Sequence, residues 1–339
     1  MICIYCGCKG PFSQEHSLPR ALGTFKGAPF FSDRICRDCN SKIGKLEEQF
    51  GRSGSEAFFR QFLGIKGRGE SIPVNPFMRG SAGAPPIDFI AKLPEDERVQ
   101  LLWEFNPGTQ SVREVTQVVF IDEKGKCFPV RVPDWMTTTD QLRQKMDELG
   151  LKGKFDLSCF ARDEEMERVR QIVSGLGGNN FHLREKPAEG RQISNPVAKV
   201  SVTGLYFRAL AKIGFHYMLA IANSSLTGHE SAFQKIKQFI FTGGPDEEFY
   251  KETFDPILTL PENYRPKNWG HVLVVESVKS GLQARLQFFL GPAFDPPVHI
   301  IQLTTQEIDK IGKKGHFHMY YEGGAQEGYD GIVSDLTVS

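Results

Sequence analysis

Hydrophobic positions along the chain follow helical spacing in some segments and strand-like alternation in others. From Gly54 to Leu63, large apolar residues recur at helical spacing and predict a helix with one apolar face. Similar periods, bounded by turn residues, predict the other elements. The predicted helices are 139–149, 163–176 and 202–223, and the predicted strands are 116–121, 126–132, 155–160, 271–276, 282–290, 298–303 and 316–321. Helices and strands mixed in this order indicate an α+β fold.

Composition divides the 339 residues into three zones. Residues 1–65 are dense in Cys, Gly and basic residues, and we expect a small N-terminal module there. Residues 66–115 are rich in Gly and Pro, which is typical of an irregular connector. Residues 116–339 carry most of the predicted elements. We expect them to form a larger mixed α+β C-terminal domain that positions DNA or senses a signal.

The charge of the chain is balanced overall but not locally. There are 41 Lys and Arg against 41 Asp and Glu, which excludes binding of nucleic acid by bulk positive charge. Residues 1–80 nevertheless hold twelve Lys and Arg against seven Asp and Glu. No secretory leader opens the sequence, and basic residues interrupt its most apolar stretch, 205–222. We therefore expect a cytoplasmic protein with a basic N-terminal region.

Two Cys-x2-Cys pairs lie close to the start of the chain. Cys3 pairs with Cys6, and Cys36 pairs with Cys39. Two such pairs complete a tetrahedral Zn²⁺ site that leaves no position for water, so the spacing predicts a structural zinc ion. Cys8 either replaces Cys6 in this site or lies outside it. The glycine between these two residues suits the turn after a zinc knuckle and favours the second interpretation.

Further residues in the same region are not needed for a structural zinc site. They are Glu15-His16 followed by Pro19, Asn40 directly after Cys39, and Glu47-Glu48 preceded by Gly44. Together with the cysteine pairs, this pattern over about residues 1–55 resembles the HNH endonucleases, in the branch with two zinc-binding cysteine pairs. The resemblance implies a zinc-stabilised ββα-metal module, similar to a treble clef, that hydrolyses phosphodiester bonds.

The resemblance also implies a role for each of these residues. His16 would be the general base, which suits an imidazole that titrates near neutrality. Glu15 would bind the catalytic ion, and Asn40 would tie the hairpin together and orient the base. The helix position that usually holds a histidine is Glu47 here, with Glu48 as the alternative. Carboxylate ligands favour Mg²⁺ or Mn²⁺ as the catalytic ion.

Basic residues around this pattern are expected to contact the phosphates of nucleic acid, with DNA as the expected substrate. They are Arg20, Arg37, Lys42 and Lys45. In the predicted helix 202–223, three basic residues recur at intervals of four, namely Arg208, Lys212 and His216. They are either a phosphate contact or the solvent-facing edge of a core helix.

A metal-dependent HNH-type endonuclease is the leading hypothesis. One form of it is an effector of bacterial antiviral defence that awaits an activating ligand or protein at the C-terminal domain. The alternative is a non-catalytic zinc module that binds nucleic acid or a protein partner. That alternative explains the cysteines and the basic region but leaves Glu15-His16 and Asn40 without a role.

Overall fold

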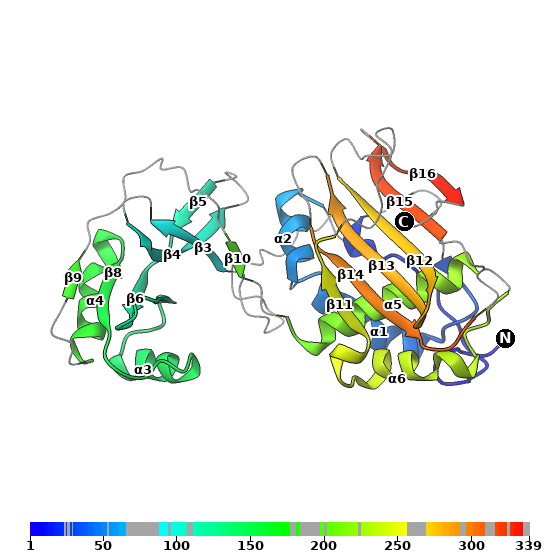
Figure 1. Cartoon of the computed structure of the whole chain (residues 1–339), viewed down its shortest axis with the longest axis horizontal. Coiled ribbons are helices and arrows are strands. Elements are labelled where there is room, and N and C mark those ends of the chain that lie inside the picture. The colour runs from blue at the N-terminus through cyan, green and yellow to red at the C-terminus, as the bar shows by residue number, and fades with distance from the viewer. Residues whose placement is uncertain are drawn as a thin grey trace. The chain divides into compact units, whose positions relative to one another are not determined.

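A computed structural model gives the fold of the chain (Figure 1). It describes residues 1–23, 25, 28, 30–52, 54–65, 88–93, 96–106, 111–176, 181–183, 197–199, 202–222, 225–255, 269–291, 296–308, 316–323 and 326–334. Two compact units are formed: unit 1 comprises Met1–Pro85 and Ser201–Ser339, and unit 2 comprises Pro86–Val200. This division differs from the expected domains at 1–65 and 116–339, because residues 201–339 belong to the same unit as residues 1–85, whereas residues 116–200 belong to unit 2.

The N-terminal part of unit 1 is a short antiparallel strand pair followed by two helices. β1 (Glu15–His16) pairs with β2 (Phe30–Phe31), and η1 (Arg20–Leu22) lies between them in sequence. α1 (Arg37–Phe50) comes next, with its apolar residues on one buried face. α2 (Gly54–Phe62) follows it and confirms the predicted helix at 54–63.

A six-stranded antiparallel sheet forms much of the rest of unit 1, in the order β11-β14-β13-β12-β15-β16. α5 packs on β12, β13, β14 and α1, and α6 packs on α5 and β14. Figure 1 shows α1, α5 and α6 behind the sheet. The bounds are α5 (Gly204–Ile221), η3 (Ser231–Phe233), α6 (Gln234–Thr242), η4 (Asp246–Glu248), β11 (Tyr250–Thr253), β12 (Gly270–Val278), β13 (Gly281–Leu290), β14 (Val298–Thr304), β15 (His316–Gly323) and β16 (Gln326–Ser334).

One hydrophobic core joins these two parts of unit 1. Phe50 of α1, Phe215 of α5 and Leu286 of β13 are all fully buried in it. A Cβ atom at Gly214 would lie 2.9 Å from the Cβ of Ala284, so the glycine allows α5 to approach the sheet closely. The first 50 residues therefore share a core with α5 and the sheet, and they do not depend on a metal ion alone for their apolar packing.

Unit 2 contains two four-stranded sheets in the orders β10-β3-β4-β5 and β7-β6-β8-β9. β3, β4 and β5 lie where the glycine and proline content predicted a connector, and Val99, Leu101 and Trp103 of β4 are buried. Residues 66–87 of that segment lie outside the described residues. The bounds are β3 (Asp88–Leu93), β4 (Asp96–Asn106), β5 (Ser111–Glu114), β6 (Gln117–Ile121), β7 (Cys127–Arg131), α3 (Thr139–Glu148), β8 (Asp156–Phe160), α4 (Asp163–Ser174), β9 (Phe181–Leu183) and β10 (Val197–Lys199).

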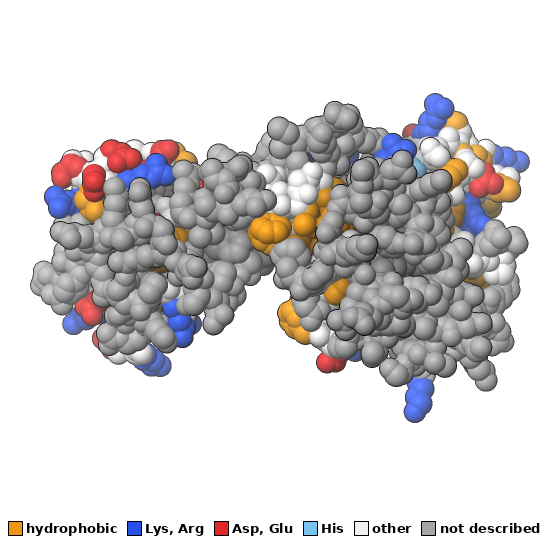
Figure 2. All heavy atoms as spheres, turned by 90° about the horizontal axis from the view of Figure 1, so that it is seen from above, with side chains coloured by type: hydrophobic (Ala, Val, Ile, Leu, Met, Phe, Trp, Pro, Cys, Tyr) orange, Lys and Arg blue, Asp and Glu red, His pale blue; other side chains and the backbone are white. Residues whose placement is uncertain are grey.

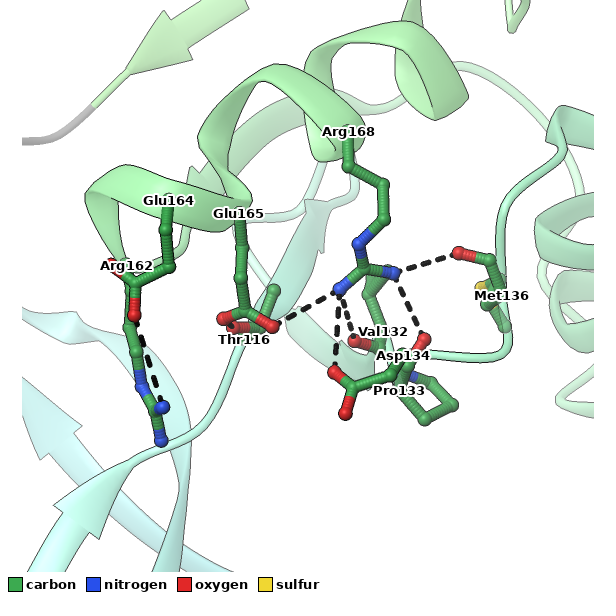
Figure 3. Close-up of polar contacts among 9 residues, drawn as sticks. All are labelled: Thr116, Val132, Pro133, Asp134, Met136, Arg162, Glu164, Glu165 and Arg168. Atoms are coloured by element: carbon green, nitrogen blue, oxygen red, sulfur yellow. Dashed lines mark hydrogen bonds and ion pairs between the residues drawn. The ribbon is translucent and has the colours of Figure 1, made fainter.

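Arg168 of α4 fixes the segment that follows β7 in unit 2. Its guanidinium donates to the carbonyl oxygens of Pro133 at 2.9 Å and Met136 at 2.8 Å (Figure 3). It also pairs with Glu165 at 3.2 Å, and Glu165 accepts a hydrogen bond from Thr116. On the face of unit 2 that Figure 2 shows, acidic and basic side chains are interspersed. The described side chains on that face therefore carry both signs of charge.

Candidate active site and thiol cluster

The four predicted cysteines lie together at the start of α1. Their sulfur atoms lie within 4.8 Å of one another, and the Sγ atoms of Cys6 and Cys36 are 3.6 Å apart. Tetrahedral zinc with bonds of about 2.3 Å needs sulfurs about 3.8 Å apart, so the thiols of Cys3, Cys6, Cys36 and Cys39 fit a zinc ion. Cys8 is not a member of this group.

Backbone hydrogen bonds help to position these thiols. The Gly7 amide donates to the Cys3 carbonyl oxygen at 2.9 Å, which closes the first turn. Cys36 is the N-cap of α1 and its sulfur accepts from the Cys39 amide at 3.5 Å. A helix N-terminus stabilises a thiolate, whereas burial raises the pKa of the Cys39 thiol. A cation among the sulfurs would offset that burial.

Glu15 and His16 project from opposite faces of β1, as adjacent strand residues do. Glu15 is buried, whereas His16 is partly exposed and its ring lies 6.0 Å from the exposed ring of Phe30 on β2. Arg20 Nε donates to His16 Nε2 at 3.2 Å. Because Nε2 accepts this bond, the proton of the neutral ring is on Nδ1, and Nε2 is the basic nitrogen.

Asn40 connects the first turn of α1 to the segment that leads into β1. Its Nδ2 donates to the carbonyl oxygen of Gln14 at 3.4 Å. Gln14 directly precedes Glu15, so this long bond holds the helix against the strand that carries both candidate site residues. Asn40 was expected to tie the hairpin together, whereas this bond joins α1 to the segment before one strand of the hairpin.

A lysine ammonium lies between the two carboxylates that were expected to bind the catalytic ion. Lys212 of α5 contacts Glu15 Oε1 and Glu47 Oε1 through Nζ, and it donates to the His16 carbonyl oxygen at 3.1 Å. The Lys212 side chain is fully buried. Glu15 and Glu47 are thus brought together, although they come from different elements.

The charges in this group stabilise one another. Burial opposes the positive charge of Lys212, but Glu15 and Glu47 outweigh burial and raise the Lys212 pKa. Burial also disfavours the Glu15 carboxylate, yet Lys212 and His216 lower the Glu15 pKa to about 2. The pKa shifts of Lys212 and Glu15 therefore keep the ammonium and the Glu15 carboxylate charged at neutral pH.

His216 and Tyr5 extend this group away from the carboxylates. The His216 Nδ1 lies 3.5 Å from Glu15 Oε1, and the His216 Nε2 lies 2.8 Å from the Tyr5 hydroxyl. Burial lowers the pKa of His216 to about 4, so the ring is neutral at pH 7. We call these residues the Lys212 cluster: Tyr5, Glu15, Glu47, Lys212 and His216.

The Lys212 cluster does not fit a divalent cation as it is arranged. Carboxylate oxygens are the donors that Mg²⁺ prefers, but Lys212 Nζ contacts one oxygen of each of Glu15 and Glu47.

The three basic residues of α5 fit neither of the two interpretations given for them, a phosphate contact or a solvent-facing edge of the helix. Lys212 and His216 face neither phosphate nor solvent, because both are buried, and Arg208 donates to the carbonyl oxygens of Ile240 and Phe241.

The remaining candidates lie on the solvent side of α1 and η1. Arg20, Arg37, Lys42 and Lys45 are exposed, and Lys42 Nζ lies 5.5 Å from the centre of the Phe241 ring. Glu48 is exposed and pairs with Arg52 at 2.8 Å. Of the two acidic alternatives, Glu47 is therefore the one beside Glu15.

Sequence reasoning missed the part of the Lys212 cluster that comes from α5. The available signal was a lysine and a histidine four residues apart in a helix that is otherwise apolar on most of its surface. Lysine is almost never fully buried without a charged partner. A lysine buried in this helix would therefore have required a buried carboxylate from elsewhere in the chain.

Comparison of the chain with protein-family models, with curated proteins and with solved structures finds no match. The assignment of function therefore depends on the residues and their geometry. Among the helices that the structure describes, none combines the length and the apolar content needed to cross a membrane.

Proposed function

We propose that the chain is an HNH-type endonuclease that hydrolyses phosphodiester bonds in DNA, with His16 as the general base. The observation that carries the proposal is the arrangement of β1, β2 and α1. This arrangement leaves the His16 imidazole accessible, buries Glu15 on the opposite face of β1, and brings Asn40 of α1 to the same strand.

In this proposal the chain's own residues move one proton and hold one phosphate. Arg20 Nε donates to the lone pair of His16 Nε2 in the structure, and in the proposed reaction the guanidinium turns to the phosphate whose charge increases, which frees this lone pair. Nε2 then takes a proton from water as the water oxygen forms a bond to phosphorus, and the bond from phosphorus to the leaving oxygen breaks. Exposed Arg37, Lys42 and Lys45 supply further phosphate contacts along the DNA.

The proposal includes Mg²⁺ or Mn²⁺ as an expected cofactor of the active form, in addition to the zinc ion of the thiols. A hard divalent ion, when bound, supplies neutralisation of the charge on the phosphate and the leaving oxygen. Because Lys212 contacts both candidate carboxylates, no step of the reaction above is assigned to that ion.

Cleavage of supercoiled plasmid tests the proposal, with Mg²⁺, Mn²⁺ or a chelator in parallel samples and with single-stranded DNA and RNA as further substrates. We expect His16→Ala to lower cleavage by about 10²-fold or more while its zinc content stays the same. His229→Ala is the matched control, because His229 is an exposed histidine whose Nε2 lies 3.3 Å from the carbonyl oxygen of Ile2 and which has no role in the proposed reaction.

Equal cleavage by the parent and His16→Ala would refute the assignment of the base. Binding of DNA without any cleavage, in the parent and in variants of Lys212, would favour the non-catalytic zinc module instead.

A further inference from the structure

The Lys212 cluster brings two carboxylates to a single ammonium. Lys212 Nζ contacts both Glu15 and Glu47, and buried His216 is neutral. A divalent cation would bring two positive charges to the same two carboxylates, whereas the ammonium brings one. The ammonium is thus a partial substitute for such an ion.

Two buried polar atoms of the cluster also lack a hydrogen-bond partner among the described residues. They are Glu15 Oε1 and His216 Nδ1, and the side chains that carry them are 6% and 0% exposed. Glu15 Oε1 forms an ion pair with Lys212 Nζ, but the geometry of this contact is not that of a hydrogen bond. Buried polar atoms are normally hydrogen-bonded, so this carboxylate oxygen retains capacity for another ligand.

A second buried carboxylate in unit 1 shows what a purely structural network looks like. Glu56 Oε1 lies 3.1 Å from His299 Nε2, and Glu56 Oε2 accepts from the Tyr206 hydroxyl at 2.7 Å. The remaining ring nitrogen of His299 lies 3.0 Å from the Tyr250 hydroxyl. Every polar atom of that network has a partner, and no lysine takes part in it. The two clusters therefore differ in the property that a ligand site requires.

We propose that Lys212 occupies the cation position between Glu15 and Glu47 and keeps it closed to divalent ions until its ammonium leaves. This inference rests on the proposed function, because the ion that would enter between Glu15 and Glu47 is the one that the proposed nuclease uses. Lys212 comes from α5, which packs on both α1 and the six-stranded sheet. Lys212 lies on α5, whereas Glu15 lies on β1 and Glu47 on α1, so a change in the position of α5 relative to these two elements would withdraw the ammonium from both carboxylates.

The test is binding of Mn²⁺ to the zinc-loaded full-length protein, with free Mn²⁺ counted by its electron paramagnetic resonance signal. Zinc holds the thiol site more tightly than manganese does, so the signal reports the carboxylates. We expect Lys212→Met to bind one Mn²⁺ at least about tenfold more tightly than the parent, which corresponds to about 1.4 kcal/mol. Lys235→Met, which changes an exposed lysine of α6, should bind like the parent.

A further variant assigns the ion to the two carboxylates. Adding Glu47→Gln to Lys212→Met should abolish the gained Mn²⁺ site. Equal Mn²⁺ affinity of the parent and Lys212→Met would overturn the inference, as would a gained site that survives Glu47→Gln. Lys212→Gln is the second substitution, in case Lys212→Met does not fold. If neither variant folds even when Mn²⁺ is supplied, the ion does not replace the ammonium, and the inference fails.

Failure of this inference and failure of the proposed function give different results. Mn²⁺ binding gained by Lys212→Met without DNA cleavage would retain the closed cation position and refute the nuclease. DNA cleavage by the parent that depends on His16, together with unchanged Mn²⁺ binding in Lys212→Met, would retain the nuclease and refute the closed position.

Discussion

Replacement of His271 by Gln tests whether one neutral, buried imidazole limits the stability of unit 1 in acid. The register of β12 against β13 shifts between Gly270 and Val272, and Phe289 opposite has a φ of 60°. The Phe289 amide donates to His271 Nδ1 at 3.1 Å. An irregularity in strand register removes backbone groups from the hydrogen-bond ladder, so this amide takes a side-chain acceptor instead. The proton of the ring is therefore on Nε2, which donates to the Leu22 carbonyl oxygen at 2.9 Å.

The magnitude follows from the pKa of His271. Burial lowers this pKa from the ordinary 6.5 to about 4. Below pH 6.5 the unfolded chain therefore binds a proton that the folded chain does not, and the free energy of unfolding falls as the pH falls from 6.5 to 4. At about 1.4 kcal/mol for each pKa unit, the loss by pH 4.5 is about 2 kcal/mol. Above pH 6.5 the neutral ring contributes its full stabilisation.

The assay is urea unfolding at several pH values, followed by the fluorescence of Trp269. The ring of Trp269 lies 5.2 Å from that of His271. Trp103 and Trp135, the other tryptophans of the chain, lie in unit 2 and are replaced by Phe in every sample. Gln can donate and accept hydrogen bonds but does not titrate. Between pH 7 and pH 4.5, His271→Gln should therefore lose about 2 kcal/mol less stability than the parent.

The control is His229→Gln, which changes an exposed histidine and should follow the pH curve of the parent. The buried His216 titrates in all samples and does not affect the difference between them. Parallel pH curves for the parent and His271→Gln would refute the reasoning, because they would mean that His271 binds its proton equally in the folded and unfolded chain.

Two other predictions concern the thiols and the backbone. Cys36→Ser should lose bound zinc and destabilise the protein, whereas Cys8→Ser should keep one zinc ion per chain. Metal analysis by mass spectrometry measures the zinc content of both variants. Equal zinc content in the two variants would contradict the predicted zinc site. Gly281→Ala should destabilise by about 2 kcal/mol or more, because its φ is +115° and a Cβ would lie 2.0 Å from the Thr304 carbonyl oxygen. Gly44→Ala should stabilise α1 by about 0.5–1 kcal/mol, because a Cβ there would meet no atom within 4 Å apart from the adjacent residues and the nearby backbone of its own helix; thermal unfolding measures both substitutions.

Much of the secondary structure of the chain could be predicted because each element carries its own hydrophobic period. The segment predicted as a helix at 202–223 is α5 (Gly204–Ile221), and the hairpin predicted at 116–132 is formed by β6 and β7. The sheet order could not be predicted, because β11 pairs with β14 and β12 with β15 across long stretches of sequence. Such pairings depend on contacts that no local period encodes.

The candidate site likewise has one part that local sequence predicts and another that depends on contacts between distant residues. The cysteine pairs and Glu15-His16 lie within 40 residues of one another, so their spacing alone indicated a shared site. Lys212 lies 196 residues after His16, whose carbonyl oxygen it contacts, and local spacing contains no information about that partner. Burial of the lysine was the missing fact, because an exposed lysine at the same position would need no carboxylate.

The two-residue strand β1 separates the accessible and the buried functions of the site. His16 faces solvent on one side, where a DNA backbone can reach it, and Glu15 faces the core on the other, where α5 lies. A buried charged triad stabilises a fold no better than well-packed apolar residues would, so stability alone does not explain Lys212 between two carboxylates. The closed cation position that we propose would explain it. The proposed nuclease would then stay inactive until Lys212 left the two carboxylates, which is the property expected of an effector that must not cut its own cell's DNA.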